Sequence, residues 1–384
     1  MKTLKLALLL AFPLLPSSRT VAQPIQCSLL SAGNNSVFLS WTATPGKHYH
    51  IQIATNLDGA WLNAFNPPET FTACTNSPGC SLPVAAGVRF FRIAELSTNS
   101  VPMGMALIPA GSFTMGDTFN EGDSEELPPH TVYVSSFYMD RCEVSKALWD
   151  SVFQWATNHG YTFGTPGAGK ADDHPAQSTP WYGMAKWCNA RSEKEGRVPA
   201  YYTDAAHTIV FRTGASDVQN DWVNWSGGYR LPTEAEWEKG ARGGFSGYRF
   251  PWGDTISHSQ ANYYSTADYT YDVSPTRGHH PAFDTGEMPY TAPTGSFPPN
   301  GFGLYDVVGN VWELCWDWYD TTYYHASPPA DPYGPDSGSQ RVMRGAGWGV
   351  GTSAFQCRLA FRIGHDPGSF NMRIGFRCVL PVGQ

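Results

Sequence analysis

The stretch GFGLYDVVGNVWELCWDWY, residues 301–319, is the part of the chain around which the fold is organised. Its close-spaced glycines allow backbone turns that other residues adopt only at a cost. Asp306 and Glu313 stand in it among three tryptophans. This composition predicts a rigid, oxygen-lined loop in an aromatic core, which is what a hard cation such as Ca²⁺ requires. The alternative is a glycine-rich core turn whose carboxylates only cap nearby N–H groups.

The composition of the whole chain narrows the class of protein. Its 384 residues are enough for two domains, each with its own core. The net charge of -8 argues against a nucleic-acid partner, because such a partner requires clustered Lys and Arg. Charged residues make up 15% of the chain and aromatic residues 14%, which favours a loop-rich fold stabilised by aromatic packing.

Residues 1–22 have the pattern of a secretory signal peptide. Lys2 and Lys5 precede an apolar run, and Thr20-Val21-Ala22 reads as a small-residue cleavage site. The run is too short for a permanent anchor, and no later segment is apolar for long enough to span a bilayer. We therefore expect a secreted or periplasmic protein without a transmembrane anchor. Its cysteines then lie in a compartment that permits disulfides, and their even number favours pairing without fixing the connectivity.

Residues 24–100 have the pattern of a small all-β module. Apolar residues alternate from 37 to 41 and again from 49 to 53, as in strands with one buried face. The pattern resembles a fibronectin-III-like sandwich. Cys74 and Cys80 flank an Asn-Ser-Pro-Gly turn, so we expect a local disulfide between them.

Residues 103–381 have a different character, with short strands, a few helices and long loops rich in Gly and Pro. Three helices are predicted from N-caps, stop signals and apolar stripes. They are expected between Ser145 and Gly160, from Tyr182 to Glu195, and from the capping box formed by Thr233 and Glu236 onward. In the second helix, the apolar stripe predicts that Cys188 points inward.

A series of motifs runs in order along this second part of the chain. The motifs are MALIPAGSFTMGD (105–117), FYMDRCEVSKALW (137–149), WCNARSEKEGRVPAYY (187–202), GYRLPTEAEWEKGARGG (228–244), FPWGD (250–254), the opening stretch, RVMRGAGW (341–348), CRLAFR (357–362) and IGFRC (374–378). Together they resemble the formylglycine-generating enzyme, or sulfatase-modifying factor, family. The resemblance implies an α+β fold related to C-type lectins, with bound calcium.

The family's best-known members oxidise a cysteine of a sulfatase to formylglycine with copper and molecular oxygen, using two cysteines late in the domain. A soft Cu(I) ion needs two thiolates within bonding reach. The resemblance places this pair between RGAGW and CRLAFR, where residues 349–356 contain no cysteine, and Gly347 stands where the family usually has serine. We therefore expect a chain that cannot perform this oxidation in the usual way.

Cys357 is a candidate for a displaced catalytic thiol, because it lies at the edge of that region. The family carries no copper ligand at its position, however, and a lone thiol cannot form a two-coordinate site. A disulfide with Cys142 or Cys315 is favoured over catalysis, and the sequence does not choose between these partners. Copper is expected only if an oxidase site with a relocated thiol exists.

The resemblance also implies a disulfide between Cys188 and Cys378, whose positions form a structural bridge in family members. Such a bridge would stabilise the domain by roughly 4–5 kcal/mol in the chain-entropy model. The alternative is two buried free thiols, which export makes less favourable. Cys27 is left without an assigned partner.

For calcium, the resemblance implies a site in the opening stretch. The ligands fall on the side chains of Asp306 and Glu313 and on the backbone oxygens of Gly309 and Val311. Asp replaces the Asn that the family often has at position 306, which keeps an oxygen ligand and adds charge. This implication favours bound calcium over a core turn.

A second calcium site of the family would use Asn262 and the Tyr263 carbonyl. The aspartate that the family has before the segment 291–293 is missing from its place, and Asp284 or Glu287 could substitute for it.

We therefore expect a non-catalytic member that binds a protein or a glycan. The aromatic-rich stretches at 316–319 and 323–324 suit stacking on sugars or contact with a peptide, although the default role of such side chains is in the core. The alternative is an oxidase with a relocated thiol site involving Cys357. The sequence names neither the ligand nor the oligomeric state.

Overall fold

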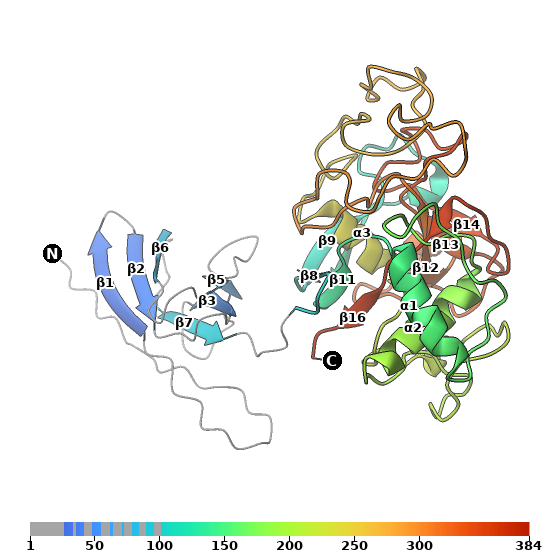
Figure 1. The fold of residues 1–384 in the computed structure, drawn as a ribbon. Helices are drawn as coiled ribbons and strands as arrows, with labels where there is room; N and C mark the ends of the chain where they lie inside the picture. The colour runs from blue at the N-terminus through green and yellow to red at the C-terminus, as the bar shows by residue number, and fades with distance from the viewer. Residues whose placement is uncertain are drawn as a thin grey trace. The chain divides into compact units, whose positions relative to one another are not determined.

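The computed structural model describes residues 101–383 in full and, before them, the backbone of seven strands between Cys27 and Glu95 (Figure 1). The chain divides into two compact units, residues 1–100 and 101–384. The predicted signal peptide, Cys74, and the side chains of Cys27 and Cys80 lie outside the described residues. Within the described part, no helix combines the length and the apolar character that crossing a membrane would need.

The described strands of the first unit form two antiparallel sheets. One sheet has the order β1-β2-β6, and in the other β3 pairs with β4, β5 and β7. The strands are β1 (Cys27–Gly33), β2 (Ser36–Trp41), β3 (His48–Ala54), β4 (Leu62–Asn63), β5 (Phe71–Thr72), β6 (Gly79–Pro83) and β7 (Phe90–Glu95).

The second unit combines helices and short strands with long loops, which confirms the α+β prediction. Its strands are β8 (Met105–Ile108), β9 (Gly111–Met115), β10 (His130–Val134), β11 (Phe137–Asp140), β12 (Trp312–Trp318), β13 (Arg341–Arg344), β14 (Ile363–His365), β15 (Ile374–Gly375) and β16 (Val379–Pro381). Its helices are α1 (Lys146–Thr157), α2 (Trp181–Lys194) and α3 (Glu234–Arg242), with 3-10 turns η1 (Ser124–Glu126), η2 (Asn220–Trp222) and η3 (Tyr323–His325).

The three helices begin where the sequence predicted. The Ser145 side chain caps α1 by accepting from the Leu148 N–H. Thr233 and Glu236 form both bonds of the predicted capping box at the start of α3, and Gly243 ends this helix in the left-handed conformation. In α2, Cys188 is fully buried, as its position on the apolar stripe predicted.

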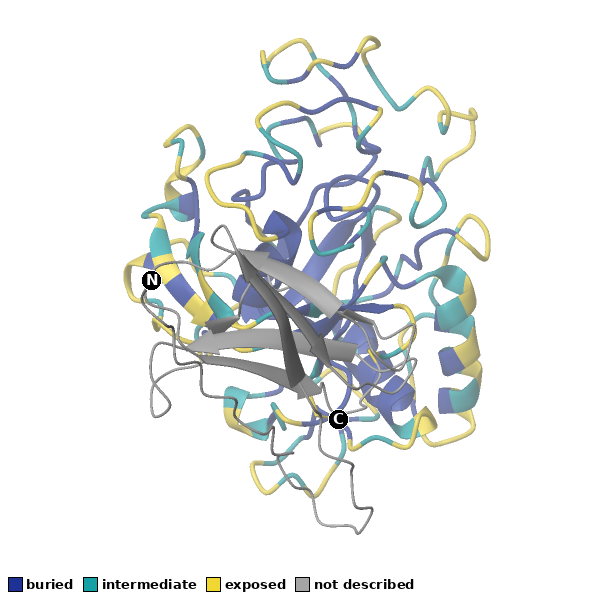
Figure 2. Ribbon diagram, turned by 90° about the vertical axis from the view of Figure 1, so that its left-hand side faces the viewer, coloured by how far each residue is buried: buried dark blue, intermediate teal, exposed yellow. Residues whose placement is uncertain are grey.

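The strands of the second unit form three sheets. β9 and β10 make a two-stranded hairpin, and β11 lies between β8 and β16, so that the beginning and the end of the unit share one sheet. The third sheet has the order β14-β13-β12-β15, and its β12–β15 pair is parallel. Every residue of β12 is buried, which makes this strand the centre of the unit. In Figure 2 the buried residues gather in these central strands and in the helices beside them, and the surrounding loops carry most of the exposed positions.

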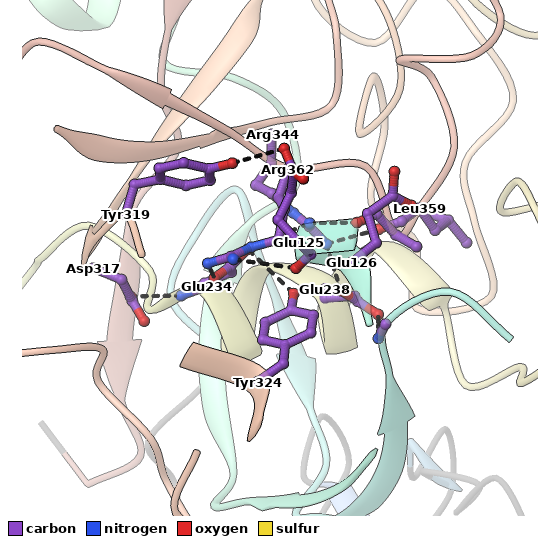
Figure 3. A network of polar contacts seen from close by, with 12 residues as sticks. Glu125, Glu126, Glu234, Glu238, Asp317, Tyr319, Tyr324, Arg344, Leu359 and Arg362 are labelled. Carbon is purple, nitrogen blue, oxygen red and sulfur yellow. Dashed lines mark hydrogen bonds and ion pairs between the residues drawn. The ribbon is translucent and has the colours of Figure 1, made fainter. Parts of the chain in front are cut away.

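A network of buried ion pairs joins α3 to the central sheet (Figure 3). Glu234 forms two bonds of 2.7 Å with Arg362, and Glu238 accepts from Arg344 and from Arg242. The Arg344 guanidinium also donates to the carbonyls of Leu359 and Ala360. Because each buried charge has a partner, this network stabilises one orientation of α3 against β13.

Candidate functional site

The stretch 301–319 has two parts in the structure: a tight turn up to residue 311, followed by the strand β12. Asp306, Gly309 and Asn310 all have positive φ angles, of 53°, 82° and 64°. At Gly309 a side chain has no room, because a Cβ there would lie 2.6 Å from the Asn262 carbonyl oxygen. The glycine therefore lets the turn pack directly on the backbone of residue 262.

Three buried carboxylates meet at this turn. Glu313 forms bonds of 2.7 and 2.6 Å with the guanidinium of Arg377 and accepts from the Trp237 indole at 2.8 Å. The sequence predicted Asp306 and Glu313 but missed Glu143, which accepts from the Asn310 side chain and from the Val311 N–H. The signal for Glu143 was an acidic residue between the apolar neighbours Cys142 and Val144.

The charges at the turn do not balance. Among the described residues, Arg377 is the cation that forms an ion pair with this group of three carboxylates. Burial raises the pKa of Asp306 to about 6, and the Glu313 carboxylate adds to the rise. Burial, with Asp306 and Glu313 nearby, also raises the pKa of Glu143 well above its usual range. A further positive charge at the turn would relieve this repulsion.

Two oxygen atoms at the turn are buried without a hydrogen-bond partner: Asp306 Oδ1 and Asn262 Oδ1. The other Asp306 oxygen accepts from the Gly295 N–H at 2.5 Å. Asn262 uses its amide N–H groups on the Tyr290 carbonyl and on the Asn310 side chain, so its oxygen is the atom left over. Buried acceptors without a donor are costly, and a cation satisfies them.

Of the carboxylate ligands that the resemblance implied for Ca²⁺, Asp306 has an orphaned oxygen, whereas both oxygens of Glu313 already accept hydrogen bonds. Orphaned oxygens, surplus negative charge and a rigid turn are what an oxygen-liganded cation requires. The residues that would hold the ion are Asp306 and Glu313 through carboxylates and Gly309 and Val311 through carbonyls. Within residues 101–383, no three His, Cys, Asp or Glu side chains are grouped so as to hold a metal by themselves. The implied site would thus depend on backbone oxygens.

The residues of the second implied calcium site, Asn262 and Tyr263, do not lie together with the carboxylates suggested for it. The Tyr263 carbonyl lies 3.1 Å from a ring nitrogen of His258. The Asn262 backbone and side chain contact Asn310, so Asn262 joins the turn around Asp306. Asp284 and Glu287 are exposed. The structure brings Asn262 to the first site and gives it no contact with either substitute carboxylate.

The segment 349–356, where the resemblance places the thiol pair, has Arg373 packed against its first residues. A Cβ built on Gly349 would lie 2.4 Å from Nε of Arg373 and 2.6 Å from its guanidinium carbon. Arg373 also donates to the Val350 carbonyl at 2.9 Å, and its guanidinium lies 5.2 Å from the centre of the Trp348 ring. An arginine therefore fills the space into which a side chain at position 349 would point.

The remaining thiols of the second unit are poor candidates for catalysis. Cys357 is fully buried, and burial raises the pKa of its thiol well above the usual range. Burial likewise raises the pKa of Cys315, and it raises that of Cys142 to about 11. All three are free thiols in the structure, so neither predicted pairing of Cys357 is formed. A thiolate is disfavoured at each of these positions, and the thiolate is the form that binds a metal.

Cys188 and Cys378 lie together, as the resemblance implied. Their sulfur atoms are 3.6 Å apart and both residues are fully buried. A disulfide needs about 2.05 Å between the sulfurs, so the structure shows two thiols in contact.

The aromatic side chains suggested for ligand stacking are mostly part of the core. Trp316, Trp318 and Tyr324 are buried, and Tyr319 and Tyr323 are half-buried. Trp318 packs on the buried guanidinium of Arg341 at 3.5 Å. The idea that these two stretches present a sugar-binding surface is therefore wrong, because β12 carries the tryptophans into the middle of a sheet.

Comparisons with known proteins agree with the motifs. Residues 92–382 match the family model described as "Sulfatase-modifying factor enzyme 1-like domain". A formylglycine-generating enzyme from Streptomyces coelicolor is 36% identical over 297 residues, which cover 72% of this chain and 88% of the relative. A mouse relative named inactive C-alpha-formylglycine-generating enzyme 2 is 28% identical and covers 73% of this chain and 86% of its own length. Among solved structures, Treponema denticola variable protein 1 is similar with a TM-score of 0.54 and 28% identity, over 72% of this chain and 94% of that one.

Proposed function

Because the chain belongs to the sulfatase-modifying factor enzyme 1-like family, we propose that residues 101–383 form a binding domain that has lost cysteine oxidation and recognises a protein or a glycan. One observation carries this proposal. The segment that holds the thiol pair in the family contains no cysteine, and the Arg373 guanidinium fills the space beside Gly349. The name of the mouse relative indicates that the family includes members without the activity.

The alternative, an oxidase that uses Cys357, finds no support in the surroundings of this thiol. Its sulfur is enclosed, its thiolate is disfavoured by burial, and a negative charge at Asp272 disfavours the thiolate further. A two-coordinate copper site needs a second thiolate within reach. Copper therefore has no part in the proposed function.

We also propose that calcium is a structural component of this domain. When bound, the ion would supply positive charge to the Asp306 turn and satisfy its orphaned oxygens. The carboxylates of Asp306 and Glu313 would hold it, with the carbonyls of Gly309 and Val311. Its effect would be on the stability of the turn and of β12, which begins directly after it.

The proposed setting is outside the cytoplasm. The pattern of residues 1–22 supports cleavage and export, and the contact between Cys188 and Cys378 supports a disulfide in an oxidising compartment.

Turnover measurements test the loss of oxidation. The full chain is loaded with Cu(I) and mixed with a cysteine-containing peptide in air, and oxygen uptake and loss of the peptide thiol are followed. The Streptomyces coelicolor relative serves as the positive control. We expect no turnover above that of free copper. Turnover that Cys357→Ser abolishes would instead establish the relocated thiol site.

A further inference from the structure

A cavity of about 280 Å³ opens in the second unit away from the Asp306 turn and the 349–356 segment. Its wall comes from the connection between β10 and β11, the start of α3, and the loops around residues 225 and 332. None of the proposed calcium ligands lines it. The side chains that matter for its chemistry are Ser135, Trp225, Arg230, Glu236, Asp331 and Tyr333.

Two aromatic rings form one side of the cavity. Trp225 and Tyr333 stack with their centroids 5.3 Å apart and an angle of 25° between the planes. Two contacts hold Trp225 in place: its ring packs edge-on against the buried Trp316, and its indole N–H donates to the Asn220 carbonyl. Tyr333 is 42% exposed. The wall therefore presents a flat, partly accessible aromatic side chain on a fixed base.

The loop that carries Tyr333 is held against β10. The Tyr133 N–H donates to the Pro329 carbonyl, and the Asp331 N–H donates to the Tyr133 carbonyl. The Asp331 carboxylate accepts from the N–H and the hydroxyl of Ser135, at 2.6 and 2.8 Å. These bonds already use the backbone of β10 at this point, which disfavours a peptide that would bind by adding a strand.

The polar side of the cavity is close to neutral. Arg230 pairs with Glu236 through two bonds of 2.6 Å, and Lys239, which donates to the carbonyls of Val134 and Gly111, lies near Asp331. Of the charged side chains that line the cavity, Arg230 and Glu236 neutralise each other, and Asp331 adds one negative charge that disfavours an anionic ligand. Arg230 keeps a buried N–H, at Nε, without a partner. A neutral ligand rich in hydroxyl groups suits these charges better than an anion.

We propose that this cavity binds one neutral hexose unit of a glycan. A pyranose ring has an apolar C–H face that packs on an aromatic side chain such as Tyr333, and its hydroxyls can donate to Asp331. The volume of 280 Å³ lies just below the range of drug-sized ligand pockets, roughly 300–1,000 Å³, which suits one ring and not an extended chain. The inference rests on the proposed function, in which the domain acts by binding. Of the two ligand classes proposed there, protein and glycan, it chooses the glycan.

The test is binding of simple glycosides to the full chain. The probes are the methyl glycosides of glucose, galactose, mannose and N-acetylglucosamine, and binding is followed by saturation-transfer NMR and by tryptophan fluorescence. We expect at least one probe to bind and Tyr333→Ala to weaken it by about tenfold or more. Tyr333→Phe should retain binding, and Asp331→Asn should weaken it. Tyr248→Ala, at a tyrosine of similar exposure outside this cavity, is the matched control.

Two outcomes would overturn the proposal. One is the absence of binding for all four glycosides, with melting curves that show a folded protein. The other is binding that neither Tyr333→Ala nor Asp331→Asn weakens, which would place the sugar elsewhere. In the first case, binding of a proline- and aromatic-rich peptide that Tyr333→Ala weakens would assign the cavity to a peptide. The turnover measurement and the glycoside measurement are independent. Oxidase activity would contradict the proposed function, and the absence of glycoside binding would contradict this inference.

Discussion

Arg373 lies directly beside Gly349, in space that a side chain at position 349 would need. The guanidinium rests on Trp348 and on the Val350 carbonyl, in the space beside Gly349. Within residues 101–383, no acidic side chain forms an ion pair with Arg373. Its position is therefore set by packing and by one carbonyl, and a side chain at 349 would compete with it directly.

Adding a methyl group at position 349 tests this competition. We expect Gly349→Ala to lower the free energy of unfolding by about 1 kcal/mol, because the guanidinium must give up its contacts. In an Arg373→Ala background the same change should cost almost nothing, so the double-mutant cycle should show coupling in thermal or urea unfolding. Gly164→Ala is the control, because a Cβ there meets nothing within 4 Å. Additive effects of the two changes would contradict this arrangement.

Asp317 is a second residue with a testable environment. It is buried beside Glu234, and it accepts from the Glu234 N–H at 2.7 Å. Burial, with the Glu234 charge, raises the pKa of Asp317 to about 8, from an ordinary value of 3.8. Between these values the folded protein holds a proton that the unfolded chain has lost, so stability falls as pH rises through this window.

We expect Asp317→Asn to flatten the loss of stability between pH 5 and pH 8. Asn keeps an acceptor for the Glu234 N–H and does not titrate, so a slope of at most about 1.4 kcal/mol per pH unit should disappear. Urea unfolding at several pH values measures this, with the exposed Asp336→Asn as control. Parallel curves for the variant and the natural chain would show that Asp317 does not carry the pH dependence.

At the scale of elements, α2 and the segment before β16 are joined at Cys188 and Cys378. The two sulfurs are already in contact, and a bridge would close a loop of about 190 residues. In the chain-entropy model such a closure contributes about 5 kcal/mol at most. The bridge would tie the second helix to the end of the chain.

We expect the exported protein to contain this disulfide, and reductant to lower its melting temperature. Cys188→Ala should reduce the effect of reductant to what a Cys74–Cys80 bridge contributes, whereas Cys315→Ala, which removes another buried thiol, should leave the full effect in place. Mass spectrometry of peptides alkylated under denaturing conditions identifies the linked pair. Free alkylation of Cys188 and Cys378 in the exported protein would refute the bridge.

The elements differ in how far the sequence could predict them. Helices α1 and α3 were predictable because their N-caps, Ser145 and Thr233, form bonds within one turn of chain. Strand β12 was not predictable from its sequence, because it has no alternation of polar and apolar residues that matches an exposed and a buried face. All its residues are buried, including Glu313 and Asp317. A strand covered on both sides lacks the period-two pattern. The sequence therefore does not distinguish the core tryptophans of β12 from tryptophans that contact a ligand.

At the scale of the molecule, the candidate calcium site was predictable only through the family resemblance. Composition alone left a core turn as an equal alternative. Glu143, 163 residues before Asp306 in the printed sequence, could not be assigned to the site, because it reaches Asn310 through tertiary packing. The cavity beside Tyr333 was also out of reach, since its wall joins residues from 134 to 381.

Removal of calcium tests the site in the intact chain. We expect a chelator to lower the melting temperature, and calcium at roughly 100 times Kd to restore about 2.7 kcal/mol, a shift of about 5 °C or more. Asp306→Ala should abolish the response and Asp306→Asn should retain part of it, because the amide oxygen can still serve as a ligand. The exposed Asp268→Ala is the control. Protein free of calcium by metal analysis, with a melting temperature that added calcium leaves unchanged, would rule the site out.

The last residues of the chain have a consequence for the order of events during synthesis. β16 pairs with β11, Arg377 pairs with Glu313, and Cys378 meets Cys188. A nascent chain therefore lacks one strand of a sheet, one buried countercharge and one thiol until the segment 377–381 has emerged from the ribosome. Such long-range pairing slows folding and delays its completion until this segment is available. A domain that cannot close before this segment is available is also one that can still be threaded through a translocation channel.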